Sequence, residues 1–187
     1  MINDQSPDEN VVEAVLTGDR DAFGIIVDRY KDRLYSIGYR FFYNADDSND
    51  FCQEVLIRVY EKLDTYSFHA PFRYWIGKIA YNHGINKKKR KGNRFDTHES
   101  IETESGERLH EPVEKEEIIS LLTKAVNSLP SEYRICIDLY YFWGMPFRNI
   151  SAITDFPVNT IKSYVHRARS LLRDSLRGTI AEEYHDL

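Results

Sequence analysis

The sequence contains few cysteines, glycines and prolines and no long hydrophobic run. Among its 187 residues are two cysteines, nine glycines and six prolines. Cys52 and Cys136 lie far apart within apolar patterns typical of helices, so we expect both thiols to fill the core rather than form a disulfide framework. No stretch approaches the roughly 18 uninterrupted apolar residues of a membrane span, and the acidic N-terminus lacks the apolar segment of a signal peptide. We therefore expect a cytoplasmic protein without membrane insertion.

The usual signatures of catalysis are also missing. The six histidines show no metal-ligand spacing with one another or with the cysteines, and there is no glycine-rich phosphate loop. Carboxylates on the expected helices are typical of solvated faces rather than of an acid/base pair. These absences favour a binding protein over an enzyme, with no catalytic residue, no cofactor and no metal.

Charge is strongly segregated, although the formal net charge is only −5. Residues 71–95 contain no acid, and acids predominate in residues 96–117. Basic residues again outnumber acids in residues 162–177. Two basic blocks separated by an acidic segment predict two binding surfaces on two modules.

Hydrophobic periodicity predicts helices throughout and no strand. Apolar residues recur at three- and four-residue steps in several segments, which we expect to be helical: about 9–16, 23–41, 47–63, 72–90, 113–127, 130–142, 146–154 and 157–178. Residues 92–112 are polar and acidic without periodicity, as in a flexible linker. The sequence thus predicts an all-α protein with two helical domains, residues 1–91 and 113–187, joined by a flexible acidic linker.

One face of the expected helix 72–90 suits single-stranded DNA. Aromatic rings stack on unpaired bases, lysines neutralise phosphates and amides bond base edges. The helix offers such side chains at helical spacing: Tyr74, Lys78, Tyr81, Asn82 and Asn86. The preceding loop adds Tyr66, Phe68 and His69. An ordinary solvated basic face with aromatics packed sideways is the equally open alternative.

The segment 148–178 has the spacing of a helix-turn-helix, with a short helix, a break at residues 155–157 and a longer helix. A buried stripe is expected at Ile161, Val165, Ala168 and Leu172. The first turns of the second helix are where a recognition helix contacts bases and flanking phosphates, and they carry Thr160, Lys162, Ser163, His166 and Arg167. A basic solvated helix is the alternative.

Taken in order, these segments resemble bacterial sigma factors of the small extracytoplasmic-function (ECF) group over nearly the whole chain. The acidic segment 47–55, DSNDFCQEV, is similar to the family's helix that docks on the polymerase clamp. The segments 71–76, PFRYWI, and 79–82, IAYN, resemble its melting and minus-ten helix. The segments 129–134, LPSEYR, and 159–169, NTIKSYVHRAR, resemble its minus-thirty-five domain.

This resemblance implies a role for each segment. Core RNA polymerase would be bound by Asp47, Asp50, Phe51, Gln53 and Glu54. The loop 66–71 would cradle a base flipped from the minus-ten element, and the residues singled out in 160–167 would contact the minus-thirty-five major groove. The partners implied are core RNA polymerase, promoter DNA and an anti-sigma factor, with a monomer when free. Tyr164, Asn86 and the pair Phe68–His69 depart from the family pattern, which leaves the promoter sequence open.

Two other functions fit part of the sequence. A stand-alone helix-turn-helix regulator explains the C-terminal helices and predicts a dimer on palindromic half-sites. It does not explain the face around Asn82 or the helix with Gln53 and Glu54. A helical adaptor leaves both basic stripes unused.

Overall fold

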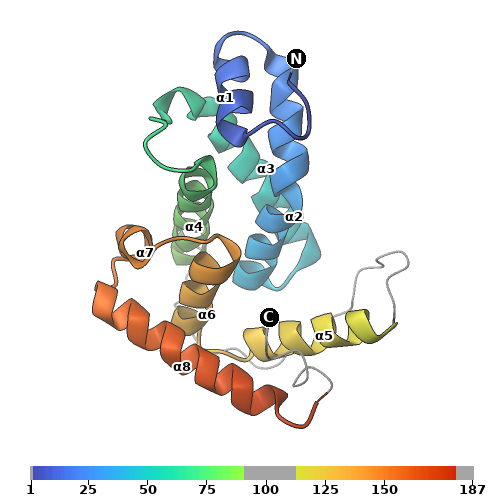
Figure 1. Cartoon of the computed structure of the whole chain (residues 1–187), viewed down its shortest axis with the longest axis vertical. Coiled ribbons are helices and arrows are strands. Elements are labelled where there is room, and N and C mark those ends of the chain that lie inside the picture. The colour runs from blue at the N-terminus through green and yellow to red at the C-terminus, as the bar shows by residue number, and fades with distance from the viewer. Residues whose placement is uncertain (1, 91–112, 180–187) are drawn as a thin grey trace. The chain divides into compact units, whose positions relative to one another are not determined.

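The computed structural model of the chain describes residues 2–90 and 113–179, and the side chains of Lys89 and of residues 113–116 are not described. The chain divides into two compact units, unit 1 (Met1–Arg94) and unit 2 (Phe95–Leu187). The described residues are helical with no strand, which confirms the all-α prediction (Figure 1). No helix in these two ranges has the length and apolarity to cross a membrane. The predicted linker, residues 92–112, falls outside the described residues.

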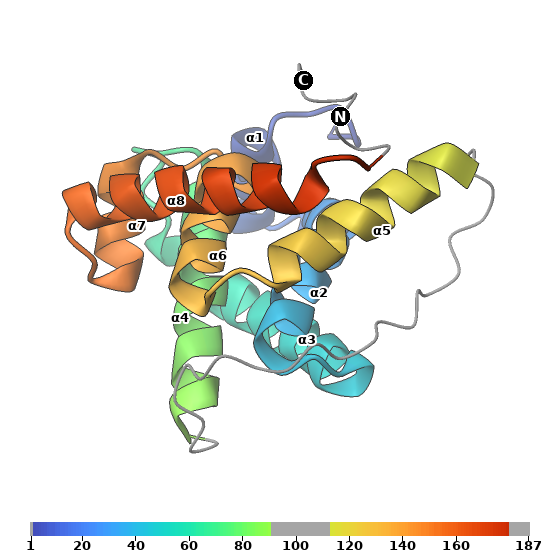
Figure 2. The same ribbon diagram turned by 90° about the horizontal axis from the view of Figure 1, so that it is seen from below.

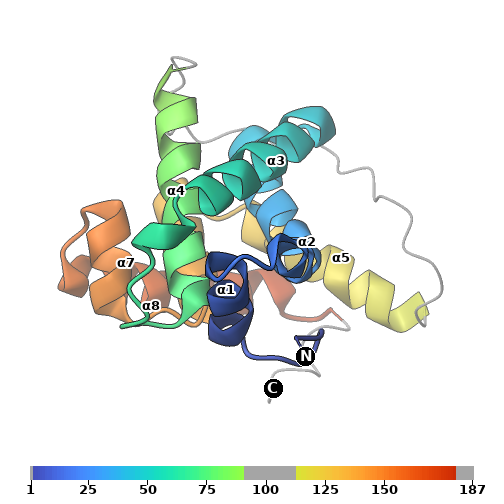
Figure 3. The ribbon, with the colours of Figure 1, turned by 90° about the horizontal axis from the view of Figure 1, so that it is seen from above.

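The described part of unit 1, residues 2–90, contains four α-helices and two short 3₁₀ turns. The helices are α1 (Asp8–Leu16), α2 (Phe23–Phe42), α3 (Ala45–Glu61) and α4 (Phe72–Arg90), with 3₁₀ turns at Arg20–Ala22 and Leu63–Thr65. α2 and α3 form the most extensive pair, and α4 packs on both of them (Figure 3). α1 packs on α2 and on the turns that flank α2 and α3. These contacts make one core from all four helices.

The connection between α2 and α3 shows why two long helices turn back on each other here. Tyr43 ends α2 in a left-handed conformation at φ 53°, and the Asn44 side chain caps α3 by accepting a hydrogen bond from Asp47 N–H at 2.9 Å. The sequence pattern placed the start near Asp47, so the prediction was late by two residues. At Gly38 the absence of a side chain lets the Ser48 backbone approach, since a Cβ there would lie 3.0 Å from Ser48 Cα.

Unit 2 contains α5 (Val113–Asn127), α6 (Ser131–Ile137), α7 (Phe147–Thr154) and α8 (Val158–Leu176). α8 is the central element, because α5, α6 and α7 all pack on it (Figure 2). Its apolar stripe packs in a core with Cys136, Leu139, Met145 and Ile150, all at most 1% exposed. Burying a side chain of this size stabilises the fold by roughly 1.5–3 kcal/mol.

The predicted helix 130–142 is interrupted by a π turn at Asp138–Phe142. Trp143 N–H bonds Asp138 C=O at 3.2 Å, five residues back instead of four. This extra residue rotates the following side chains, so Trp143 is buried and Phe142 is 55% exposed. The prediction that Phe142 continues the apolar face was therefore wrong.

The turn between α7 and α8 is built from short local contacts. Asp155 is left-handed at φ 60°, and the Ser151 hydroxyl donates to Phe156 C=O at 2.7 Å. Pro157 then occupies the N-cap position of α8. The arrangement confirms the helix-turn-helix expected in residues 148–178.

The contact between Gly84 and Phe41 generates a stability prediction. A Cβ at Gly84 would lie 2.5 Å from Phe41 Cε2 in the core, so we expect Gly84→Ala to destabilise unit 1 by about 1–3 kcal/mol through overpacking. Gly24→Ala in α2 is the matched control, since nothing lies within 4 Å of a Cβ there. Urea unfolding followed by Trp75 fluorescence, in a Trp143→Phe background, reports unit 1. Equal midpoints for the two variants would contradict this account of the α2–α4 contact.

Candidate nucleic-acid and polymerase interfaces

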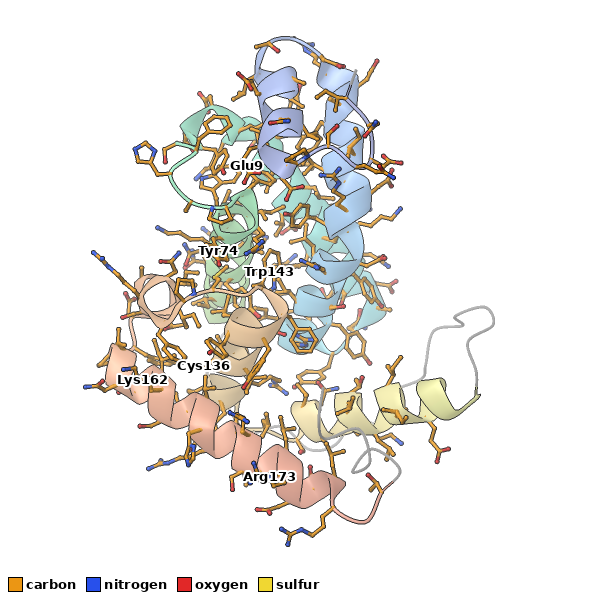
Figure 4. All side chains as sticks on the ribbon, viewed as in Figure 1. Glu9, Tyr74, Cys136, Trp143, Lys162 and Arg173 are labelled. Carbon is orange, nitrogen blue, oxygen red and sulfur yellow. The ribbon has the colours of Figure 1, made fainter. Side chains whose placement is uncertain are left out.

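α8 has one face in the core of unit 2 and the opposite face in solvent. Ile161, Val165 and Ala168 are buried as predicted, whereas Leu172, expected in the same stripe, is only half-buried. The predicted DNA-contacting side chains lie on the other side, with Thr160 half-buried and the rest exposed: Lys162, Ser163, His166 and Arg167. Figure 4 shows Lys162 near the start of α8 and Arg173 towards its end. The helix thus presents hydroxyls and cations together in its first turns.

Aromatic side chains support this exposed face from beneath. The Tyr164 ring lies 4.9 Å from the Tyr133 ring of α6 and 5.6 Å from the Phe156 ring of the turn. Arg167 Nη1 donates to the Tyr133 hydroxyl at 3.4 Å. Tyr164, a departure from the family pattern, is therefore a packing residue that helps to orient Arg167. This support could not be predicted from the sequence pattern of α8, because Tyr133 belongs to a different helix.

α4 presents a polar stripe at four-residue spacing. Lys78 and Asn86 are exposed, and Tyr74 and Asn82 are half-buried. Arg73 lies over the Tyr74 ring, with its Cζ 5.0 Å from the ring centroid. The structure thus brings four of the predicted residues onto one line along the helix.

Two predicted stacking residues are in the core instead. Tyr81 is 2% exposed and its ring meets Phe41 edge-on at 5.8 Å. Tyr66 is 5% exposed, and its ring packs on Phe72 and Trp75 at 5.2 and 5.7 Å. The expectation that both rings are available to bases was wrong, because tertiary packing covers them.

The loop between the second 3₁₀ turn and α4 nevertheless presents one ring to solvent. Phe68 is 47% exposed and adopts a left-handed conformation at φ 59°. Its ring lies 4.6 Å from that of Tyr66. His69 is exposed, and its Nδ1 lies 2.6 Å from Ser67 C=O. Phe68 and His69 therefore remain candidates for contact with a base.

Some of the polymerase-binding residues expected on α3 are exposed, and one is buried in the core. Asp50 and Gln53 are exposed and Asp47 is half-buried. Phe51 is 0% exposed and lies against Phe41, Phe42 and the His83 ring, so its expected contact with polymerase was wrong. Phe51 fixes α3 in place instead.

Sequence reasoning missed two apolar side chains on the exposed part of α3. Ile57 is 57% exposed and follows Gln53 by four residues, and Tyr60 is 43% exposed one turn further along. Exposed apolar side chains beside polar ones are typical of protein interfaces. Their spacing, four and seven residues after Gln53, could have indicated that both lie on the same exposed face of the helix.

The Glu54 carboxylate connects α3 to α4. Its oxygens lie 2.5 Å from His83 Nε2 and 2.9 Å from Lys87 Nζ. Burial alone would raise the pKa of Glu54, but the hydrogen bonds with Lys87 and His83 outweigh burial and lower it. Burial lowers the pKa of His83, against the opposing influence of Glu54. Glu54 therefore carries a charge that holds the two helices together.

A groove of about 560 Å³ runs between α3 and α4. Its lining is mostly cationic and polar: Glu54, Arg58, Lys62, Ile79, Asn82, His83, Asn86, Lys87 and Arg90. Arg58 comes from α3 and Lys62 caps its C-terminal end, so the basic block of the sequence did not reveal them. Asn82 and Asn86 belong both to this groove and to the polar stripe of α4.

The cysteines are buried, which confirms that they fill the core. Burial raises the pKa of the Cys52 thiol, and it raises the pKa of Cys136 to about 12. Among the side chains that the structure describes, in residues 2–90 and 117–179, no three histidine, cysteine or acidic groups gather as a metal site would require.

Comparison with known proteins identifies both units. The Sigma-70 region 2 family matches residues 26–94 and the Sigma-70, region 4 family matches residues 119–172. The chain is 32% identical to the ECF RNA polymerase sigma factor SigW of Bacillus subtilis over 89% of its own length and 95% of that protein. It is 30% identical to the ECF RNA polymerase sigma-E factor of Escherichia coli over 96% of its own length and 99% of that protein.

Two solved structures share the fold. The sigma factor RpoE of Bartonella quintana, in complex with the anti-sigma factor NepR, gives a TM-score of 0.64 at 21% identity, covering 83% of this chain and 97% of that one. CnrH, in complex with the cytosolic domain of CnrY, gives 0.60 at 21% identity, covering 90% and 96%. With region 2 matched in unit 1 and region 4 in unit 2, the chain belongs to the ECF sigma factors of bacterial RNA polymerase.

Proposed function

We propose that this chain binds core RNA polymerase, directs it to specific promoters and assists strand separation at initiation. One observation carries the proposal: each unit has a helix with one face in its own core and, outside that core, a polar stripe that includes exposed cationic side chains. These helices are α4 in unit 1 and α8 in unit 2. We assign polymerase binding and the minus-ten element to residues 1–91, and the minus-thirty-five element to residues 113–187. Residues 92–112 are the tether between them.

In unit 1 the polar stripe of α4 receives the separated minus-ten strand. Tyr74 offers a half-buried ring, Lys78 a cation, and Asn82 and Asn86 amides that bond base edges. Phe68 and His69 contact the flipped base from the loop. Tyr66 and Tyr81 act from the core, by holding the loop and α4 in place.

α3 supplies the polymerase contact of unit 1. Asp47, Asp50 and Gln53 provide its polar part, and Ile57 and Tyr60 its apolar part. Glu54 serves chiefly to hold α3 on α4. The helix that binds polymerase, α3, and the helix that binds DNA, α4, therefore form one connected pair.

In unit 2 the first turns of α8 enter the minus-thirty-five major groove. Lys162 and Arg167 are suited to guanine O6 and N7 or to flanking phosphates. Thr160, Ser163 and His166 add hydrogen-bonding groups at the same end of the helix.

The chain has no catalytic role in this proposal, because bond formation belongs to the polymerase. We place it in the cytoplasm, as a monomer until it binds the polymerase or an inhibitory anti-sigma protein. Exposed apolar side chains occur in both units, Ile57 and Tyr60 in one and Tyr141 and Phe142 in the other. They are suited to partners that cover them.

The proposal is tested by run-off transcription with cognate core polymerase on a library of promoter fragments, with core enzyme alone as the control. We expect new start sites preceded by a common pair of elements. If core enzyme neither binds the chain nor gains a start site, the proposal fails and a stand-alone regulator, which would bind palindromic DNA as a dimer, takes its place.

Arg167→Ala tests the assignment of α8. We expect about a tenfold loss of affinity for promoter DNA, since a good arginine–guanine pair contributes roughly 1–3 kcal/mol. Arg173→Ala is the matched control, because it removes the same charge from an exposed position farther along α8. Holoenzyme binding to fragments with and without the minus-thirty-five element gives the measurement. Equal losses for the two variants would reduce the role of Arg167 to general electrostatics.

Ile57→Ser tests the polymerase face of α3. Ile57 is largely exposed, so the change leaves the core intact, and we expect the affinity for core polymerase to fall by about tenfold, as at an interface hot spot. Leu16→Ser on α1 is the control, at an apolar position that is 43% exposed. Fluorescence anisotropy of the labelled chain with core polymerase measures both. Unchanged affinity for Ile57→Ser would move the contact away from this part of α3.

A further inference from the structure

Glu9 of α1 reaches the loop that precedes α4, more than fifty residues later in the chain. Its Oε1 accepts a hydrogen bond from the Phe72 backbone N–H at 3.2 Å and lies 3.5 Å from the Tyr66 hydroxyl. Figure 4 shows Glu9 on α1, on the side where this loop lies. One side chain of α1 thus contacts residues at both ends of the loop 66–71.

The Phe72 N–H needs such a partner. It belongs to the first residue of α4, where backbone N–H groups have no acceptor within the helix. The preceding residue is Pro71, whose side chain has no acceptor atom with which to cap the helix. A carboxylate at this end is also favoured by the helix dipole. Glu9 therefore acts as the cap of α4 from a different helix.

The Tyr66 side chain joins the two ends of the loop. Its hydroxyl donates to Ala70 C=O at 2.7 Å, and its ring packs edge-on against Phe72. Burial, followed by the charge of Glu9, raises the pKa of Tyr66 to about 12, so the hydroxyl keeps its proton for this bond. The loop is closed by Tyr66 and held to α1 by Glu9.

α1, which carries Glu9, is itself held firmly in unit 1. The neighbouring Asp8 lies 2.7 Å from Arg29 Nη1 and accepts from the Tyr30 hydroxyl at 2.5 Å, both on α2. Val11, Val12 and Val15 of α1 are buried in the core of unit 1. The position of Glu9 is therefore determined by the core of unit 1 rather than by the loop it contacts.

The loop held in this way displays Phe68. A left-handed conformation of a non-glycine residue costs roughly 1–2 kcal/mol and persists only where surrounding contacts enforce it. At φ 59°, with its ring against Tyr66 and about half of it in solvent, Phe68 meets this description. Whatever fixes the ends of the loop also fixes where this ring points.

We propose that Glu9 is a positioning residue that sets base selectivity at the minus-ten position received by the loop 66–71. It acts through Phe72 and Tyr66 and touches no DNA. The inference rests on the proposed function, and it assigns a role in promoter selectivity to a helix outside the polar stripe of α4.

The test uses holoenzyme and a set of promoters in which each minus-ten base is replaced in turn by the other three. For Glu9→Ala we expect the preference for the best over the worst base to fall about fivefold at one position, in line with the loss of one partly buried hydrogen bond. Glu9→Gln keeps an acceptor oxygen and should recover most of the preference. Glu13→Ala removes the same charge from an exposed site on α1 and should match the parent chain.

Two further measurements separate positioning from general damage. Hydrogen exchange of the free chain should be faster in residues 66–75 of Glu9→Ala and unchanged in Glu13→Ala. Tyr66→Phe, which removes only the hydroxyl, should weaken selectivity at the same position and serves if Glu9→Ala fails to fold. A uniform fall in transcription from all promoters, or an unchanged base preference, would overturn the proposal. If the parent holoenzyme starts no transcripts at all, the proposed function itself fails.

Discussion

Every surface that unit 1 presents depends on how closely α4 packs on α2 and α3. Gly84 carries no side chain, and the Phe41 ring occupies the space that a Cβ would need. Gly38 likewise allows α2 and α3 to pack closely, because the Ser48 backbone approaches it where a Cβ would lie. Because packed interiors resist changes of even one methylene, these two contacts set the spacing of the three helices. The Glu54 carboxylate, bonded to His83 and Lys87, then fixes how α3 and α4 face each other.

In unit 2 the orientation of α8 depends on apolar burial more than on polar contacts. The Arg167–Tyr133 hydrogen bond is 3.4 Å long and exposed, and such contacts contribute little to stability. Burial of Ile161, Val165 and Ala168 supplies the larger contribution, since apolar burial is worth roughly 25 cal/mol per Å². The core therefore orients α8, and the polar contacts only refine where the exposed side chains point. Changes to the exposed stripe should alter recognition while leaving the fold of the unit intact.

The sequence predicted the helices well because the apolar stripes are long and regular, and α4 and α5 have the expected bounds. The sequence-based prediction failed where an aromatic ring could either pack in the core or stack on a base. Tyr81 lies three residues after Lys78 on α4, and only the position of Phe41 shows that its ring is in the core. Phe142 was misplaced because a π turn changes the period within one helix. Arg58 was missed because the groove it lines forms only when α3 meets α4.

The net charge of −5 does not describe the local charge beside the proposed DNA-binding residues of α4 and α8. At physiological ionic strength, charges are screened over about 8 Å, so a phosphate responds to the side chains nearest to it. In the groove between α3 and α4, four arginine and lysine side chains and one carboxylate line the wall, and that carboxylate already pairs with Lys87. Within α8 itself the single acid is Asp174, which lies 3.9 Å from Arg177, the residue that caps the far end of the helix. The first turns of α8 therefore carry cations with no acid among them, although acids elsewhere in the chain make the overall charge negative.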